Sequence, residues 1–90
     1  MRNSHRSYLL DRYLNKRVEI TRQDGIYIGY LQYDDGWYYM NDYYYLKKTD
    51  DGYEKPIIKD RWVFRKTTVS RAKDIRTISD SAVVDMRGAE

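Results

Sequence analysis

A chain of 90 residues with 17 Lys and Arg against 14 Asp and Glu, and hence a net charge of +3, allows one small domain and is far less basic than a strong non-specific nucleic-acid binder. Cysteine is absent, which excludes a disulfide framework, a thiolate nucleophile and a zinc–thiolate site. No apolar run approaches the roughly 18 residues that a membrane span needs. The N-terminal segment also lacks an apolar region of the length found in signal peptides. We therefore expect a cytoplasmic protein without membrane contact.

The first predicted element is a short helix from Ser7 to Asn15. Ser7 is suited to be its N-cap, because a serine hydroxyl can accept a hydrogen bond from a free backbone amide of the first turn. Apolar residues recur at helical spacing and give the helix one apolar face: Leu10, Tyr13 and Leu14.

After the helix the apolar period changes to two, which is typical of half-buried strands. Arg17–Arg22 alternates in this way, the dipeptide Asp24-Gly25 supplies turn chemistry, and Ile26–Tyr33 is predicted to be the next strand. Gly29 inside this second strand marks a bulge or a tight bend, as small barrels need at their corners.

A second hairpin signal, Asp35-Gly36, precedes the aromatic-rich stretch Trp37–Leu46, whose composition favours a third strand. The polar segment 47–55 contains a further turn signal. The following apolar segment, Ile57–Arg65, is predicted to be the fourth strand, and Val69 is predicted to begin a short fifth element.

One helix followed by short antiparallel strands with tight turns predicts a mostly β fold, in which a strongly bent five-stranded antiparallel sheet forms a small barrel capped by the helix. The predicted barrel domain spans residues 7–75, between a flexible N-terminus over residues 1–6 and a tail over residues 76–90 that lacks aromatics and clear periodicity. The predicted core comprises the apolar residues that keep helix or strand period: Leu10, Leu14, Val18, Ile20, Ile28, Leu31, Met40, Ile58, Val63 and Val69.

Several short sequence pieces occur in a characteristic order: Leu14–Ile20, Asp24-Gly25, Gly29-Tyr30-Leu31, Asp34-Asp35, Tyr39-Met40-Asn41 and Val63–Val69. In this order and approximate spacing the chain resembles the Sm-like family over about residues 7–75. Three departures stand out. Two extra residues separate the acidic loop from Met40-Asn41, Asp42 stands where the family has an apolar residue, and Lys66 replaces the Gly that follows the family's Arg.

The resemblance implies self-association into a closed ring of about five to seven subunits, in which the fourth strand of one copy pairs with the fifth strand of the next. It also implies that single-stranded RNA binds near the pore. Carried over by position, Tyr39 stacks on a base, Asn41 reads a base edge, Asp35 orients Asn41, and Arg65 packs nearby. By their charge, Arg65 and Lys66 are also expected to contact phosphate through charge-assisted hydrogen bonds.

The residues themselves leave alternatives open. If Asp35-Gly36 forms a two-residue hairpin turn, Asn41 lies several residues down the strand, and Trp37 and Tyr38 become the aromatic residues nearest the loop. A structural or adaptor ring that keeps the assembly without specific RNA binding is the second function class. No nucleophile–base pairing, metal-ligand spacing or phosphate-binding Gly loop occurs, so we expect no catalytic site, metal site, cofactor or small-molecule substrate, and no enzyme activity.

Overall fold

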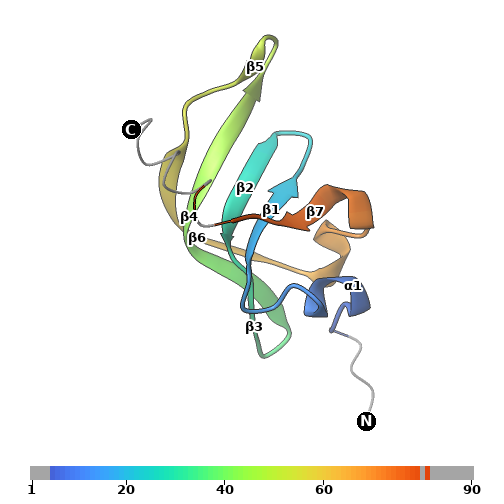
Figure 1. Ribbon diagram of the computed structural model, residues 1–90. Coiled ribbons are helices and arrows are strands. Elements are labelled where there is room, and N and C mark those ends of the chain that lie inside the picture. The colour runs from blue at the N-terminus through green and yellow to red at the C-terminus, as the bar shows by residue number, and fades with distance from the viewer. Residues whose placement is uncertain (1–4, 80, 82–90) are drawn as a thin grey trace.

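One strongly curled antiparallel sheet dominates the computed structural model, which describes residues 5–79 and 81 (Figure 1). The elements in chain order are α1 (Tyr8–Asp11), β1 (Arg17–Thr21), β2 (Gly25–Tyr30), β3 (Gln32–Asp34), β4 (Trp37–Thr49), β5 (Gly52–Tyr53), β6 (Ile57–Phe64), the 3-10 helices η1 (Lys66–Thr68) and η2 (Ala72–Asp74), and β7 (Ile75–Thr77). The sheet runs from β7 through β1, β2 and β4 to β6, with β3 and β5 paired to the two ends of β4. The predicted mostly β fold with a strongly bent sheet is therefore confirmed, in the form of a half-barrel.

Helix α1 is much shorter than the predicted segment from Ser7 to Asn15. Ser7 is its N-cap as predicted, because the hydroxyl accepts a hydrogen bond of 3.0 Å from the Leu10 amide. The helix ends after one turn because the chain then reverses: Asn15 adopts a left-handed φ of 62°, and its amide donates to the Leu31 carbonyl at 2.7 Å. This bond ties the end of the helical segment to the sheet.

The predicted strand over residues 26–33 is divided at Leu31 into β2 and β3. The amide of Leu31 donates to the Lys16 carbonyl rather than to a neighbouring strand, at 3.1 Å. Gly29 lies inside β2, two residues before this division, where a Cβ atom would come within 3.0 Å of both Met40 Cε and Tyr43 Cβ of β4. A side chain at this position would push β2 and β4 apart, so the glycine permits the close approach of these two strands.

Strand β4 is the longest element and runs along the molecule from the β3 hairpin to the β5 tip (Figure 1). Its ladder with β6 is interrupted at Asp42, which has a left-handed φ of 49°. At the start of β4, Asp35 and Gly36 have φ values of 47° and 90° between the paired residues Asp34 and Trp37. Positive φ at both central positions is the geometry of a two-residue hairpin turn, so the hairpin tip lies at Asp35-Gly36.

The last strand differs in place from the prediction. Val69 is buried but lies between η1 and η2 and begins no strand. The strand that pairs with β1 is β7, and it includes Arg76 and Thr77 of the predicted tail. Strand β7 therefore extends two residues beyond residue 75, where the predicted barrel domain ends.

The core confirms most of the predicted residues: Leu10, Val18, Ile20, Leu31, Met40 and Val69 belong to the main buried cluster, while Leu14 packs half-buried against it. Ile28 is buried elsewhere, in a second cluster with Tyr44 that Ile78 flanks. The predictions for Ile58 and Val63 were wrong, since their side chains are 55% and 44% exposed. They lie on β6, whose inward side is instead formed by Trp62 and Phe64.

Candidate nucleic-acid interface

The exposed side of the β4–β6 ladder carries alternating aromatic and arginine side chains. Alternate residues of a strand point to the same side of a sheet, so Trp37, Tyr39 and Asn41 point away from the buried Tyr38 and Met40. Across the ladder, Val63 lies opposite Tyr39 and Arg61 lies opposite Asn41. We call this surface the aromatic–arginine face; it comprises Trp37, Tyr39, Asn41, Arg61, Val63 and Arg65.

Two guanidinium groups lie over aromatic rings on this face. The Arg65 guanidinium carbon is 3.5 Å from the centroid of the Trp37 ring, and that of Arg61 is 4.6 Å from the Tyr39 centroid. Arg65 Nη1 also donates to the Gly36 carbonyl at 3.1 Å, which ties it to the hairpin tip. Since Trp37 is 40% exposed, this arginine–tryptophan stack is open to solvent.

Such stacks have the chemistry that single-stranded nucleic acid requires. A guanidinium on an aromatic ring keeps N–H groups in its plane, where they can donate to phosphate oxygens. Aromatic and guanidinium planes also provide surfaces on which bases stack. Asn41 is exposed at the end of the row and offers both a donor and an acceptor.

The residues carried over from the family resemblance are only partly brought together. Arg65 contacts Trp37 and the hairpin tip, whereas the guanidinium that lies over Tyr39 belongs to Arg61. Asp35 is exposed at the turn, where its backbone takes the left-handed conformation. Lys66 begins η1, directly after Arg65 in the chain, and is half-buried. Arg61 was not among the expected residues, because its position opposite Asn41 depends on the β4–β6 register.

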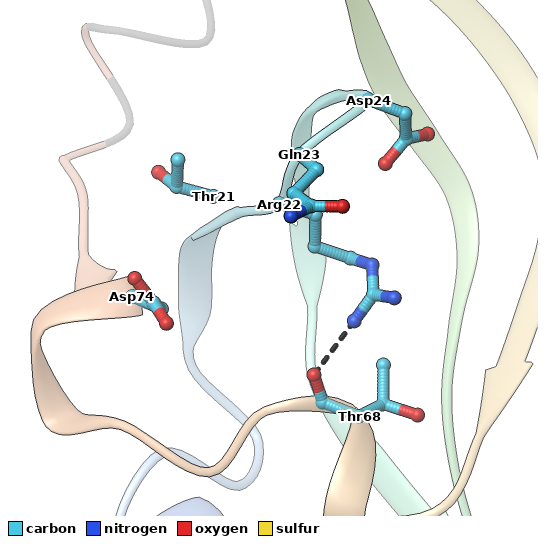
Figure 2. Close-up of a pocket in the computed structure, with 6 residues that line it drawn as sticks. All are labelled: Thr21, Arg22, Gln23, Asp24, Thr68 and Asp74. Carbon is cyan, nitrogen blue, oxygen red and sulfur yellow. Dashed lines mark hydrogen bonds between the residues drawn. The ribbon is translucent and has the colours of Figure 1, made fainter.

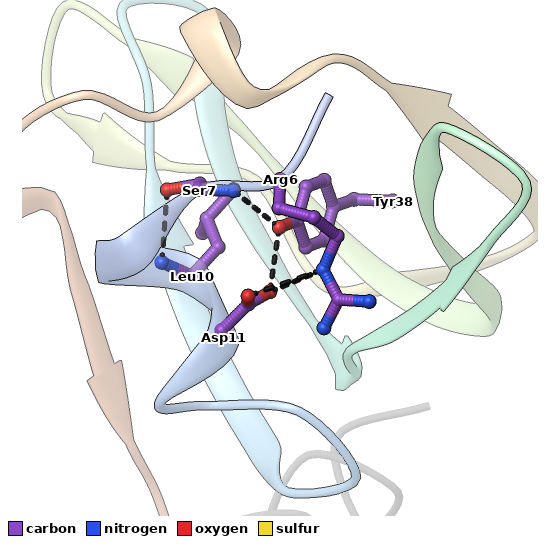
Figure 3. A network of polar contacts seen from close by, with 5 residues as sticks. All are labelled: Arg6, Ser7, Leu10, Asp11 and Tyr38. Carbon is purple, nitrogen blue, oxygen red and sulfur yellow. Dashed lines mark hydrogen bonds and ion pairs between the residues drawn. The ribbon is translucent and has the colours of Figure 1, made fainter. Parts of the chain in front are cut away.

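Tyr38, the alternative aromatic residue, is fully buried and cannot stack on a ligand. Its hydroxyl donates to Asp11 Oδ1 at 2.7 Å and accepts from the Ser7 amide at 2.6 Å (Figure 3). The Asp11 carboxylate also forms an ion pair of 3.1 Å with Arg6. This network attaches the N-terminal segment and α1 to β4 directly beneath the aromatic–arginine face.

A polar hollow of about 320 Å³ lies between the β1–β2 turn and the two 3-10 helices. Six residues line it: Thr21, Arg22, Gln23, Asp24, Thr68 and Asp74 (Figure 2). Arg22 Nη1 donates to the Thr68 carbonyl at 2.6 Å, which fixes the end of η1. Because η1 follows Arg65 directly, we regard this hollow as a support for the loop of Arg65 and Lys66. The carboxylates of Asp24 and Asp74 make it unsuited to phosphate.

Two kinds of site find no support in the part of the chain that the structure describes. No group of three or more His, Asp or Glu residues there could hold a metal ion, and none of its helices has the length and apolar character to cross a membrane.

No protein-family model matches the chain, and a search of curated proteins found no match either.

Proposed function

We propose that this chain is an Sm-like subunit that assembles into a closed ring and binds single-stranded RNA through its aromatic–arginine face. The observation that carries the RNA-binding proposal is the pair of neighbouring stacks, Arg65 on Trp37 and Arg61 on Tyr39. The role is one of binding rather than catalysis.

Two open sheet edges support the ring. Among the described residues, β6 forms a ladder only with β4, and β7 only with β1. Unpaired edges favour pairing with another chain, and a closed ring satisfies both edges of every subunit. The edge strand β6 also exposes apolar side chains, with Ile57 51% and Ile58 55% exposed. Pairing of β6 with β7 of the next copy would cover them.

The two stacks support RNA binding through their arrangement. Trp37 and Tyr39 are two residues apart on one strand, which separates them by roughly 7 Å and leaves room for a separate base at each. Arg61, Arg65 and Lys66 then supply cations for the phosphates. Asn41, at the end of the row, would read a base edge.

Fluorescence anisotropy of a labelled uridine oligonucleotide, titrated with protein at two salt concentrations, tests this function. Base stacking contributes about 1–3 kcal/mol per base, so we expect Trp37→Ala to weaken binding by that amount for each bound base. Arg65→Ala should weaken binding and reduce the salt slope by about 1, since it removes a phosphate contact. Lys55→Ala, which removes the same charge from the loop between β5 and β6, is the matched control and should leave the slope unchanged. Equal binding by wild type and both site variants would contradict the proposal.

The adaptor ring is the second candidate, and one observation favours it. Asp34 and Asp35 are exposed at the hairpin tip next to Trp37, where their charges oppose an approaching phosphate. An assembled ring that binds no RNA at low salt would exclude the first function and leave the adaptor ring as the proposal.

A further inference from the structure

A second aromatic cluster lies on the other side of the Asp42 interruption, away from the aromatic–arginine face. Tyr27 on β2 is paired with Tyr45 on β4, and Tyr43 on β4 is paired with Lys59 on β6. Together with Asp24 these side chains line a hollow of about 200 Å³. The rings of Tyr27 and Tyr45 are 5.0 Å apart, and that of Tyr27 stacks on Trp62 at 4.0 Å.

Hydrogen bonding gives this hollow a definite polarity. The hydroxyl groups of Tyr27 and Tyr45 both donate to Asp24 Oδ2, at 2.5 and 2.9 Å. Their protons are thereby occupied, and the phenol oxygens present lone pairs as acceptors. Burial alone would raise the pKa of Asp24, but the two hydroxyl hydrogen bonds lower it below its ordinary value, so the carboxylate is ionised at neutral pH. A ligand here meets acceptors and one negative charge.

A cation of the chain already lies beside these rings. Lys59 Nζ is 5.6 Å from the centroid of the Tyr45 ring, within the range of cation–π attraction. Among the described residues, no cation forms an ion pair with Asp24. Lys59 therefore occupies the rim of the hollow without neutralising the carboxylate by direct contact.

We propose that the hollow formed by Asp24, Tyr27, Tyr43 and Tyr45 binds an alkylammonium group, and that Lys59 is its intramolecular competitor. Electron-rich rings attract an ammonium group, and the phenol oxygens and the carboxylate accept hydrogen bonds from any N–H it carries. The same features disfavour phosphate. This site is independent of the proposed RNA binding, because it shares no residue with the aromatic–arginine face.

Trp62 provides the readout, since it stacks on Tyr27. The chain contains two Trp residues, so a Trp37→Phe background leaves Trp62 as the only indole fluorophore. In that background we would titrate tetramethylammonium and N-acetyl-trimethyllysine amide against the unchanged site, Lys59→Gln and Asp24→Asn. Tighter binding of the trimethyllysine derivative would identify a trimethylated lysine side chain as the preferred ligand, and tighter binding of tetramethylammonium would identify a free quaternary amine.

We expect Lys59→Gln to bind roughly threefold or more tightly than the unchanged site, because the competitor is removed. Asp24→Asn should abolish saturable binding. Asp51→Asn, which removes the same charge from the turn before β5, should leave binding unchanged. Should Asp24→Asn not fold, Tyr45→Phe keeps the ring but loses the hydroxyl hydrogen bond that positions the Asp24 carboxylate, and it should still weaken binding. The absence of a saturable Trp62 signal in Lys59→Gln would overturn the proposal, as would displacement of the amine by a uridine oligonucleotide.

Discussion

Replacing Tyr38 by Phe tests how the N-terminal segment is held to the sheet. The ring is fully buried, so removal of the hydroxyl alone leaves the packing of the core in place. The change deletes two hydrogen bonds, one donated to the Asp11 carboxylate at 2.7 Å and one accepted from the Ser7 amide at 2.6 Å. A hydrogen bond to a charged group contributes about 1.5–3 kcal/mol and a neutral one about 0.5–1.5 kcal/mol.

We expect Tyr38→Phe to lower the free energy of unfolding by about 2–3 kcal/mol, below the simple sum because Asp11 keeps its ion pair with Arg6. Urea denaturation at constant m-value measures this change. Tyr39→Phe is the matched control: its hydroxyl forms no hydrogen bond with a described residue, and the change should stay within about 0.5 kcal/mol. If Tyr38→Phe costs as little as Tyr39→Phe, the network in Figure 3 does not hold α1 to the sheet.

Wild type and Tyr38→Phe should also differ in how their stability depends on pH. Burial, together with the hydrogen bond to Asp11, raises the pKa of Tyr38 to about 12, whereas an unfolded tyrosine has a pKa of about 10. A raised folded-state pKa means that the stabilisation is fully present below about pH 10 and is lost as the pH rises towards about 12. The difference in stability between wild type and Tyr38→Phe should therefore be constant near neutral pH and shrink over this window. A difference that stays constant to pH 12 would contradict the assignment.

Two further predictions concern the core and the open edge. Leu31→Ala should lower the free energy of unfolding by about 2–5 kcal/mol, because Leu31 is fully buried where β2 ends; a loss below about 0.5 kcal/mol in urea denaturation would contradict this position. Ile58→Asp, at an exposed position of β6, should leave the far-UV circular dichroism unchanged but dissociate the ring in sedimentation velocity. Tyr8→Asp, at a position 92% exposed on α1, is its control and should still assemble.

Local chemistry was sufficient to predict much of the fold. The period-two alternation in β1 and the turn dipeptide Asp35-Gly36 correspond to observed features, because each depends on a few neighbouring residues. The turn predicted at Asp24-Gly25 lies one residue earlier, since Arg22 and Gly25 exchange backbone hydrogen bonds around Gln23 and Asp24, and Gly25 begins β2. The helix was overestimated because its apolar spacing continues to Leu14, while the bond from the Asn15 amide to the Leu31 carbonyl is a tertiary contact. The last strand was misplaced for a similar reason, since only pairing with β1 defines it.

The candidate site could be predicted only in part. Trp37 follows from the hairpin turn, once Asp35-Gly36 is recognised as its tip. Arg61 could not be found in this way, because it lies 22 positions after Tyr39 in the chain and the two meet only through the β4–β6 register. Tyr38 and Tyr39 are adjacent and identical in type, yet one is buried and the other faces outward. Only the strand's orientation distinguishes them.

Native mass spectrometry of the full chain mixed with a short uridine oligonucleotide tests the central proposal most directly, because one spectrum reports both assembly and binding. We expect a closed oligomer of about five to seven subunits with one RNA molecule bound, and we expect the RNA but not the oligomer to be lost in Trp37→Ala. A spectrum that contains only monomer without RNA, at micromolar protein and low salt, would contradict both the ring and its function.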